Sequence, residues 1–123
     1  MARIMVVEDE APVREFIRRV LEQRGHEVVA VADGAQAVLR LGRGSFDLLL
    51  TDIVMPNMDG VELALKVARD WPDLRILLMS GFTAERERAS GLSQLATGML
   101  AKPFSMVDLN QAVEAALARP PAR

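Results

Sequence analysis

The chain alternates short apolar runs with segments in which apolar residues recur at helical spacing. Continuous apolar runs are typical of strands that are buried on both faces, as in a parallel sheet. Such runs cover residues 4–7, 46–50 (interrupted by Asp47), 76–79 and 99–101, and a weaker one covers residues 28–31. The pattern therefore predicts five strands.

A helical segment follows each predicted strand. In the first segment, one face carries Val13, Phe16, Ile17, Val20 and Leu21. Start and stop signals bound this helix and the later ones: Gly25, Asp33, Pro72, and Ser105 with Asp108 three residues beyond it. The fourth segment, residues 83–95, is interrupted by Gly91 and has little to bury, so we expect this helix to be held loosely.

This alternation predicts an α/β fold with a doubly wound, five-stranded parallel sheet and five helices, because crossovers between parallel strands are right-handed. The chain has 123 residues, which suits one domain. We expect that domain to cover residues 1–119. A disordered tail is expected at 120–123, where paired prolines cannot continue a helix.

Composition excludes several kinds of function. The net charge of −2 favours neither a nucleic-acid partner nor a membrane surface. There is no cysteine, which excludes disulfides and thiolate metal sites. The apolar run near the N-terminus is too short for a signal peptide or a membrane span, so we expect a cytoplasmic protein.

Polar residues gather where the predicted strands end: Glu8, Asp9, Glu10, Asp52, Ser80 and Lys102. Ligands of doubly wound folds bind at this edge of the sheet. Each of these residues, taken alone, is explained as a turn, cap or solvated residue. That explanation is set aside only because the residues follow different strands and so converge on one edge of the sheet. Crowded carboxylates repel unless a cation intervenes, and Mg²⁺ prefers such oxygen ligands. A lysine and a hydroxyl facing the same cleft suit a phosphate.

These residues predict phosphoryl transfer. Asp52 attacks a phosphoryl group and becomes an aspartyl phosphate, while Mg²⁺ and Lys102 balance the charge. Two other classes of protein fit less well. A phosphatase of the haloacid dehalogenase type needs an acid where Val54 stands, and a flavodoxin-like electron carrier needs a phosphate-binding loop where acids follow the first strand.

The order and spacing of four motifs resemble the receiver domain of bacterial two-component response regulators. The motifs are "VVEDE", "DIVMPNMDG", "LLMSG" and "AKPF", and the likeness covers about residues 3–118. The resemblance implies the flavodoxin-like receiver fold with strand order 2-1-3-4-5, and Mg²⁺ as the cofactor.

The resemblance also implies a role for each site residue. Asp52 matches the phosphoacceptor, Glu8 and Asp9 the metal-binding acids, Val54 a backbone carbonyl ligand, Ser80 the switch hydroxyl and Lys102 the phosphate-sensing lysine. The peptide between Lys102 and Pro103 is expected to be cis. Three positions before the lysine, where the family often has an aromatic residue, stands Met99, and Phe82 lies on another loop. The usual hydroxyl-plus-aromatic switch is therefore altered here.

A receiver is expected to be a signalling module rather than an enzyme. Its implied partners are a sensor histidine kinase or histidine phosphotransferase and a downstream target protein, and we expect a monomer or weak dimer. The sequences "LLLTDIVMP" and "ILLMSGF" are similar to those of CpdR-type single-domain regulators, which govern substrate delivery to a ClpXP-type protease. The alternatives are the receiver of a hybrid kinase, an intermediate phosphorelay carrier, and a degenerate receiver. The intact set of acids, hydroxyl and lysine argues against the last.

Overall fold

The computed structural model of the chain describes residues 1–55, 58–81 and 97–120. Five parallel strands form one sheet in the order β2-β1-β3-β4-β5. The strands are β1 (Arg3–Val7), β2 (Glu27–Val31), β3 (Leu48–Asp52), β4 (Arg75–Ser80) and β5 (Gly98–Ala101). This arrangement confirms the predicted doubly wound α/β fold and its strand order.

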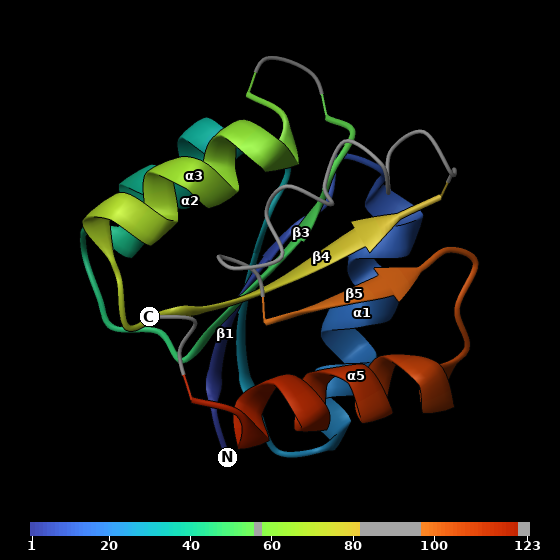
Figure 1. Cartoon of the computed structure of the whole chain (residues 1–123). Coiled ribbons are helices and arrows are strands. Elements are labelled where there is room, and N and C mark those ends of the chain that lie inside the picture. Colours follow the sequence, from blue (N-terminus) through green and yellow to red (C-terminus); the bar gives the residue numbers. More distant parts are fainter. Residues whose placement is uncertain (56–57, 82–96, 121–123) are drawn as a thin grey trace.

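Helices cover both faces of the sheet (Figure 1). They are α1 (Ala11–Gln23) and α5 (Met106–Ala118) on one side, and α2 (Gly34–Leu41) and α3 (Gly60–Asp70) on the other. Alternate residues of each strand enter the two apolar layers. On β1, Ile4 and Val6 pack with α1 and α5, whereas Met5 and Val7 pack with α2 and α3. A central strand therefore needs apolar residues on both faces, which explains the continuous apolar runs.

The ends of the helices follow the signals in the sequence. Gly25, just beyond α1, has a φ of 90°, which favours glycine. Asp33 and Asp59 accept hydrogen bonds from backbone N–H groups in the first turns of α2 and α3. Ser105 and Asp108 form a capping box at the start of α5. Three of these caps sit at the edge of the sheet where the strands end, so they fix the loops around the candidate site.

The third strand starts and ends two residues later than its apolar pattern predicted. Phe46 precedes the strand and packs under the Arg3 guanidinium, 4.5 Å from the ring centre. The Asp47 carboxylate accepts a hydrogen bond from the Arg3 backbone N–H at 2.8 Å. Both residues thus brace the entry to the strand, and Asp52 is the last residue of β3.

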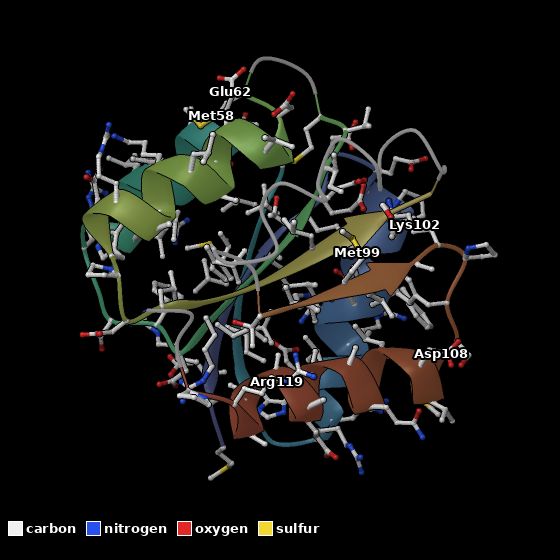
Figure 2. The ribbon with its side chains drawn as sticks, viewed as in Figure 1. Met58, Glu62, Met99, Lys102, Asp108 and Arg119 are labelled. Atoms are coloured by element: carbon white, nitrogen blue, oxygen red, sulfur yellow. The ribbon has the colours of Figure 1, made fainter. Side chains whose placement is uncertain are left out.

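Two apolar residues that the sequence pattern predicted to be buried are partly exposed. Met99 (Figure 2) is 40% exposed, and its strand, β5, lies at the edge of the sheet. Phe16 on α1 is also 40% exposed, and its ring packs beside that of Phe104 with the centres 6.4 Å apart. The apolar spacing identified both elements correctly but did not show how far these two side chains are exposed.

Some predictions fall outside the described ranges: the fourth helix at 83–95, the side chain of Phe82, and residues 121–123 of the tail. Among the helices that lie inside those ranges, none is both long enough and apolar enough to cross a membrane.

Candidate functional site

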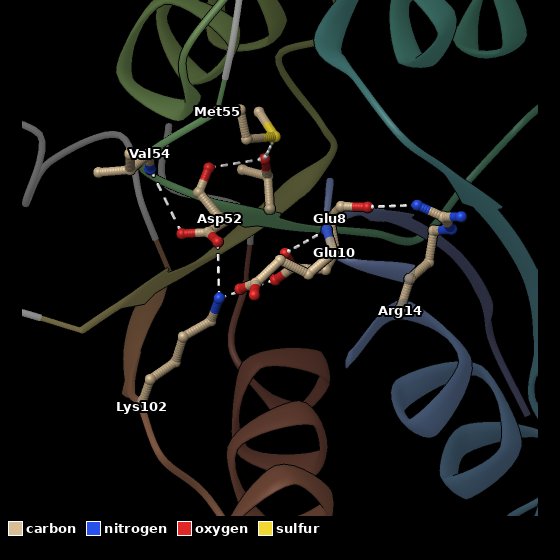
Figure 3. Close-up of polar contacts among 8 residues, drawn as sticks. Glu8, Glu10, Arg14, Asp52, Val54, Met55 and Lys102 are labelled. Atoms are coloured by element: carbon tan, nitrogen blue, oxygen red, sulfur yellow. Dashed lines mark hydrogen bonds and ion pairs between the residues drawn. The ribbon is translucent and has the colours of Figure 1, made fainter. Parts of the chain in front are cut away.

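Three charged side chains meet at the carboxyl ends of the strands (Figure 3). Lys102, just beyond β5, donates through Nζ to Glu8 Oε1 at 2.8 Å and to Asp52 Oδ2 at 2.6 Å. Glu8 follows β1 and is fully buried, and Asp52 is 5% exposed. A single ammonium group therefore reaches from the edge strand across β4 to join acids from two central strands.

Asp9 adds a third carboxylate to this cluster. One oxygen from each of Glu8, Asp9 and Asp52 lies within 4.8 Å of the other two. The loop that carries the first two acids is fixed by hydrogen bonds to Glu8. The Arg14 guanidinium donates to its carbonyl at 2.8 Å, and the Glu10 backbone N–H donates to Oε2 at 3.0 Å (Figure 3). Asp9 itself is exposed, so the cluster opens to solvent on that side.

The pKa values in the cluster reflect one lysine shared by two buried acids. Burial raises the pKa of Glu8 from 4.5 to about 7, and repulsion by Asp52 adds to the rise, although Lys102 acts in the opposite direction. Burial alone would lower the pKa of Lys102, but its contacts with the two acids outweigh burial and raise it. Pairing with a lysine usually depresses the pKa of a carboxyl. For Glu8, burial has the larger effect, and the pKa rises.

Ser80 is the last residue of β4, one position beyond Met79, which pairs with Asp52. The Ser80 carbonyl accepts a hydrogen bond from the Lys102 backbone N–H at 2.8 Å. The Ser80 hydroxyl is buried, and no hydrogen-bond partner for it is found in the structure as described. Since a buried hydroxyl without a partner costs free energy, this position suits an oxygen of a bound ligand.

A pocket of about 680 Å³ opens over the acids. Its lining includes the polar residues Asp9, Asp52 and Lys102 and the apolar residues Val13, Phe16 and Phe104. Val54 also lines it, and its backbone N–H donates to Asp52 Oδ1 at 3.3 Å. Lys102 and Pro103 both line the pocket, and the peptide bond between them is cis. The pocket is therefore lined by both charged and apolar side chains.

The donor set of the cluster fits a hard divalent cation. Three carboxylates, two from the loop after β1 and one from the end of β3, supply the oxygen ligands that Mg²⁺ prefers. A divalent cation would also relieve the repulsion that contributes to the raised pKa of Glu8, which a single lysine offsets only in part. The chemistry of these residues thus points to a metal and to an anion that approaches it.

The structure brings together Glu8, Asp9, Asp52 and Lys102, which the sequence placed at strand ends. Ser80 is joined to Lys102 through its backbone carbonyl. Met99, by contrast, lies three residues before Lys102 on β5 and makes part of the surface. Sequence reasoning missed Arg14, although its position one turn beyond Glu10 was an available signal. It also missed Thr51, whose hydroxyl donates to the Asp52 carbonyl at 3.1 Å, and no sequence signal indicates that contact.

Comparison with known protein families decides the class to which this site belongs. The sequence profile described as the response regulator receiver domain matches residues 4–114. The chain belongs to the response regulator receiver family. Receivers are signalling modules, and the acidic cluster of this receiver lies at the edge of the sheet where the family binds its metal.

Known relatives of this receiver include both short and long proteins. It is 40% identical over 114 residues to the response regulator receiver protein CpdR of Brucella abortus, in a match covering 93% of this chain and 95% of CpdR. Other curated relatives are longer. The match covers 38% of the transcriptional activator protein PfeR of Pseudomonas aeruginosa and 51% of the response regulator MprA of Mycobacterium leprae.

Solved structures of receivers share the fold closely. CheY4 of Vibrio cholerae, at 29% identity, superposes with a TM-score of 0.87 and covers 94% of this chain and 98% of its own. The response regulator TrrA of Thermotoga maritima, solved in complex with Mg(2+)-BeF, has 30% identity and a TM-score of 0.83. The match covers 93% of this chain and 97% of TrrA.

Proposed function

We propose that this receiver accepts a phosphoryl group on Asp52, with Mg²⁺ held at the acidic cluster, and then acts by binding another protein. The observation that carries the proposal is the position of Lys102. Its ammonium group hydrogen-bonds to both Asp52 and Glu8 at one edge of the sheet. The Mg(2+)-BeF complex of the relative TrrA supports the same chemistry. The proposed receiver domain covers residues 1–119.

In the proposed transfer, a carboxylate oxygen of Asp52 is the nucleophile. It forms a bond to phosphorus while the bond from phosphorus to the donor's histidine nitrogen breaks, and the imidazole leaves with that electron pair. The ammonium of Lys102, 2.6 Å from Asp52 Oδ2, balances negative charge on the phosphoryl oxygens. The buried Ser80 hydroxyl donates to one of these oxygens and so gains a partner.

Bound Mg²⁺ supplies further positive charge to the same oxygens. Asp9 and Asp52 would hold it directly, Glu8 through water, and Val54 through its backbone carbonyl. The protein's own contribution is to keep these donors at one edge of the sheet. Arg14 helps to hold them there, because its guanidinium donates a hydrogen bond to the Glu8 carbonyl in the acidic loop.

The signal would leave the site through Ser80 and Lys102. The end of β4 and the residue just beyond β5 are already joined there, since the Lys102 backbone N–H donates to the Ser80 carbonyl. A phosphoryl group that contacts both side chains would favour the conformation in which both turn toward it over the conformation without phosphate. A partner that binds one of these two conformations more tightly would then respond to phosphorylation. Met99, on β5, would repack without an aromatic swing, with Phe82 as the other candidate switch residue.

We infer a CpdR-like role: a regulator that receives its phosphoryl group from a sensor histidine kinase or a histidine phosphotransferase and governs delivery of substrates to a ClpXP-type protease. The match along 95% of the length of CpdR supports this assignment. Binding of purified ClpX should therefore differ between protein loaded with beryllofluoride, which mimics the phosphorylated aspartate, and unloaded protein. Equal binding in both states would contradict the inference.

Intact-mass measurement tests the phosphoacceptor itself. With Mg²⁺ and acetyl phosphate, the wild-type protein should gain the mass of one phosphoryl group, and Asp52→Asn should gain none. Asp73→Asn is the matched control, because Asp73 is an exposed carboxylate just before β4, at the other end of the sheet. A phosphorylated Asp52→Asn protein would show that the site is assigned wrongly.

A further inference from the structure

The backbone carbonyl of Asp52 is held from two sides. The fully buried Thr51 donates its hydroxyl to this carbonyl oxygen at 3.1 Å. Gly60, the first residue of α3, lies against the same oxygen, so that a Cβ added to it would stand only 2.1 Å away. The strand end that carries the acid is thus packed directly onto the start of α3, and only glycine permits so close an approach.

The contacts around this carbonyl leave its peptide little freedom. The Thr51 hydroxyl has one proton, and the carbonyl is a better acceptor than the Met55 sulfur, 3.9 Å from the same hydroxyl (Figure 3). The next residue, Ile53, is tied at both of its backbone polar groups. Its N–H donates to the Met79 carbonyl at 3.0 Å, and its carbonyl accepts from the Gly60 N–H at 2.8 Å.

The orientation of this peptide sets the place of the Asp52 carboxylate, because both belong to one residue. Oδ1 accepts from the Val54 N–H at 3.3 Å, and Oδ2 accepts from Lys102 at 2.6 Å. A rotation of the peptide would change both contacts. In catalysis generally, a misplacement of about 1 Å can cost about a hundredfold in rate.

We propose that Thr51 is a positioning residue for Asp52: its buried hydroxyl fixes the peptide so that the carboxylate meets Lys102 and the metal-binding acids in productive geometry. The proposal rests on the proposed function of Asp52 as phosphoacceptor and metal ligand. Thr51 touches neither the donor nor the metal, and it acts only through the backbone of its neighbour.

Two substitutions separate the hydroxyl of Thr51 from its packing. Thr51→Val keeps the shape and removes the hydroxyl, whereas Thr51→Ser keeps the hydroxyl and removes a methyl group. Thr97→Val is the matched control for loss of a buried hydroxyl. Thr97 is also buried, but it lies where β5 begins, at the other end of the sheet, and its hydroxyl accepts from the Ile76 N–H at 3.2 Å.

Each protein is measured in two ways: Mg²⁺ affinity by calorimetry without a phosphodonor, and phosphorylation rate against acetyl phosphate concentration at saturating Mg²⁺. For Thr51→Val we expect Mg²⁺ affinity about 3-fold weaker and a maximal rate about 3- to 10-fold lower, the size of effect that one hydrogen bond supplies. The half-saturating donor concentration should not change. Thr51→Ser should stay close to wild type, and so should Thr97→Val in both measurements, even where its resistance to urea falls.

Wild-type affinity and rate in Thr51→Val would overturn the proposal. A loss in Thr51→Ser as large as that in Thr51→Val would also overturn it, because the hydroxyl would then not account for the effect. If the wild-type protein binds Mg²⁺ but takes up no phosphoryl group, the proposed function fails instead, and the Mg²⁺ affinities of the variants still decide the role of Thr51.

Discussion

Replacing Glu8 with glutamine should remove a loss of stability that the metal-free protein suffers as the pH rises. The pKa of Glu8 is about 7 in the folded protein against an ordinary value of 4.5, so the folded state binds this proton more tightly than the unfolded chain. The resulting stabilisation is complete below the unfolded pKa and is lost as the pH rises through the folded pKa. Glutamine imitates the protonated side chain and has no proton to lose.

The magnitude follows from the displacement of the pKa of Glu8 from 4.5 to about 7. Because each pKa unit corresponds to ~1.4 kcal/mol, the free energy of unfolding of the wild-type protein should fall by about 3 kcal/mol relative to the variant between about pH 4 and about pH 8. Glu8 is fully buried, so solvent screens this effect less than it would at the surface. The amide of glutamine must also face the donors around Glu8, but that cost is the same at every pH.

Urea unfolding in the presence of EDTA, followed by circular dichroism across this pH range, measures the difference between the two proteins. Glu114→Gln is the control, because Glu114 is exposed and pairs with Arg24 on the surface. Its difference from wild type should stay below about 1 kcal/mol and show no trend near pH 7. Added Mg²⁺ should restore wild-type stability at high pH by binding the folded state. Parallel pH profiles for wild type and Glu8→Gln would refute the reasoning.

Two further substitutions test the acidic loop and the start of α5. Asp9→Ala should remove most Mg²⁺ binding in calorimetry, while Glu10→Ala, which removes an exposed acid outside the three-oxygen cluster, should reduce it much less; equal losses would mean that net charge alone binds the ion. Ser105→Ala should lower the free energy of unfolding by about 1 kcal/mol through loss of the capping box, and Ser45→Ala, on an exposed loop, should leave it unchanged. No difference between the two serine variants would show that the cap adds nothing.

The sequence was sufficient to predict which residues gather at the site, because that depends on topology. Apolar runs mark where parallel strands end, and all parallel strands end at one edge of the sheet. Glu8, Asp52 and Lys102 were placed together on this ground alone. The glycine beyond α1 and the capping box of α5 were equally visible, since each is a local signal that acts over a few residues.

What the sequence did not show depends on distances between side chains from different elements. The apolar pattern assigned Phe46 to a strand, but its ring packs against Arg3 before the strand begins. Nothing in the spacing shows that Lys102 contacts both acids, because its reach across β4 depends on how the sheet twists. The close approach of Gly60 to the Asp52 carbonyl is hidden for the same reason, since residues in different elements make it.

The reach of Lys102 also matters while the protein is being made. Glu8 and Asp52 leave the ribosome 94 and 50 positions ahead of the lysine that joins them. Until β5 and α5 dock, the nascent chain has its acids without their cation. Under the proposed function, a kinase that meets the chain during synthesis would therefore find an incomplete acceptor, and so would one that meets a product truncated before Lys102. A partner that recognises the proposed phosphorylated form would then bind only chains that have finished folding.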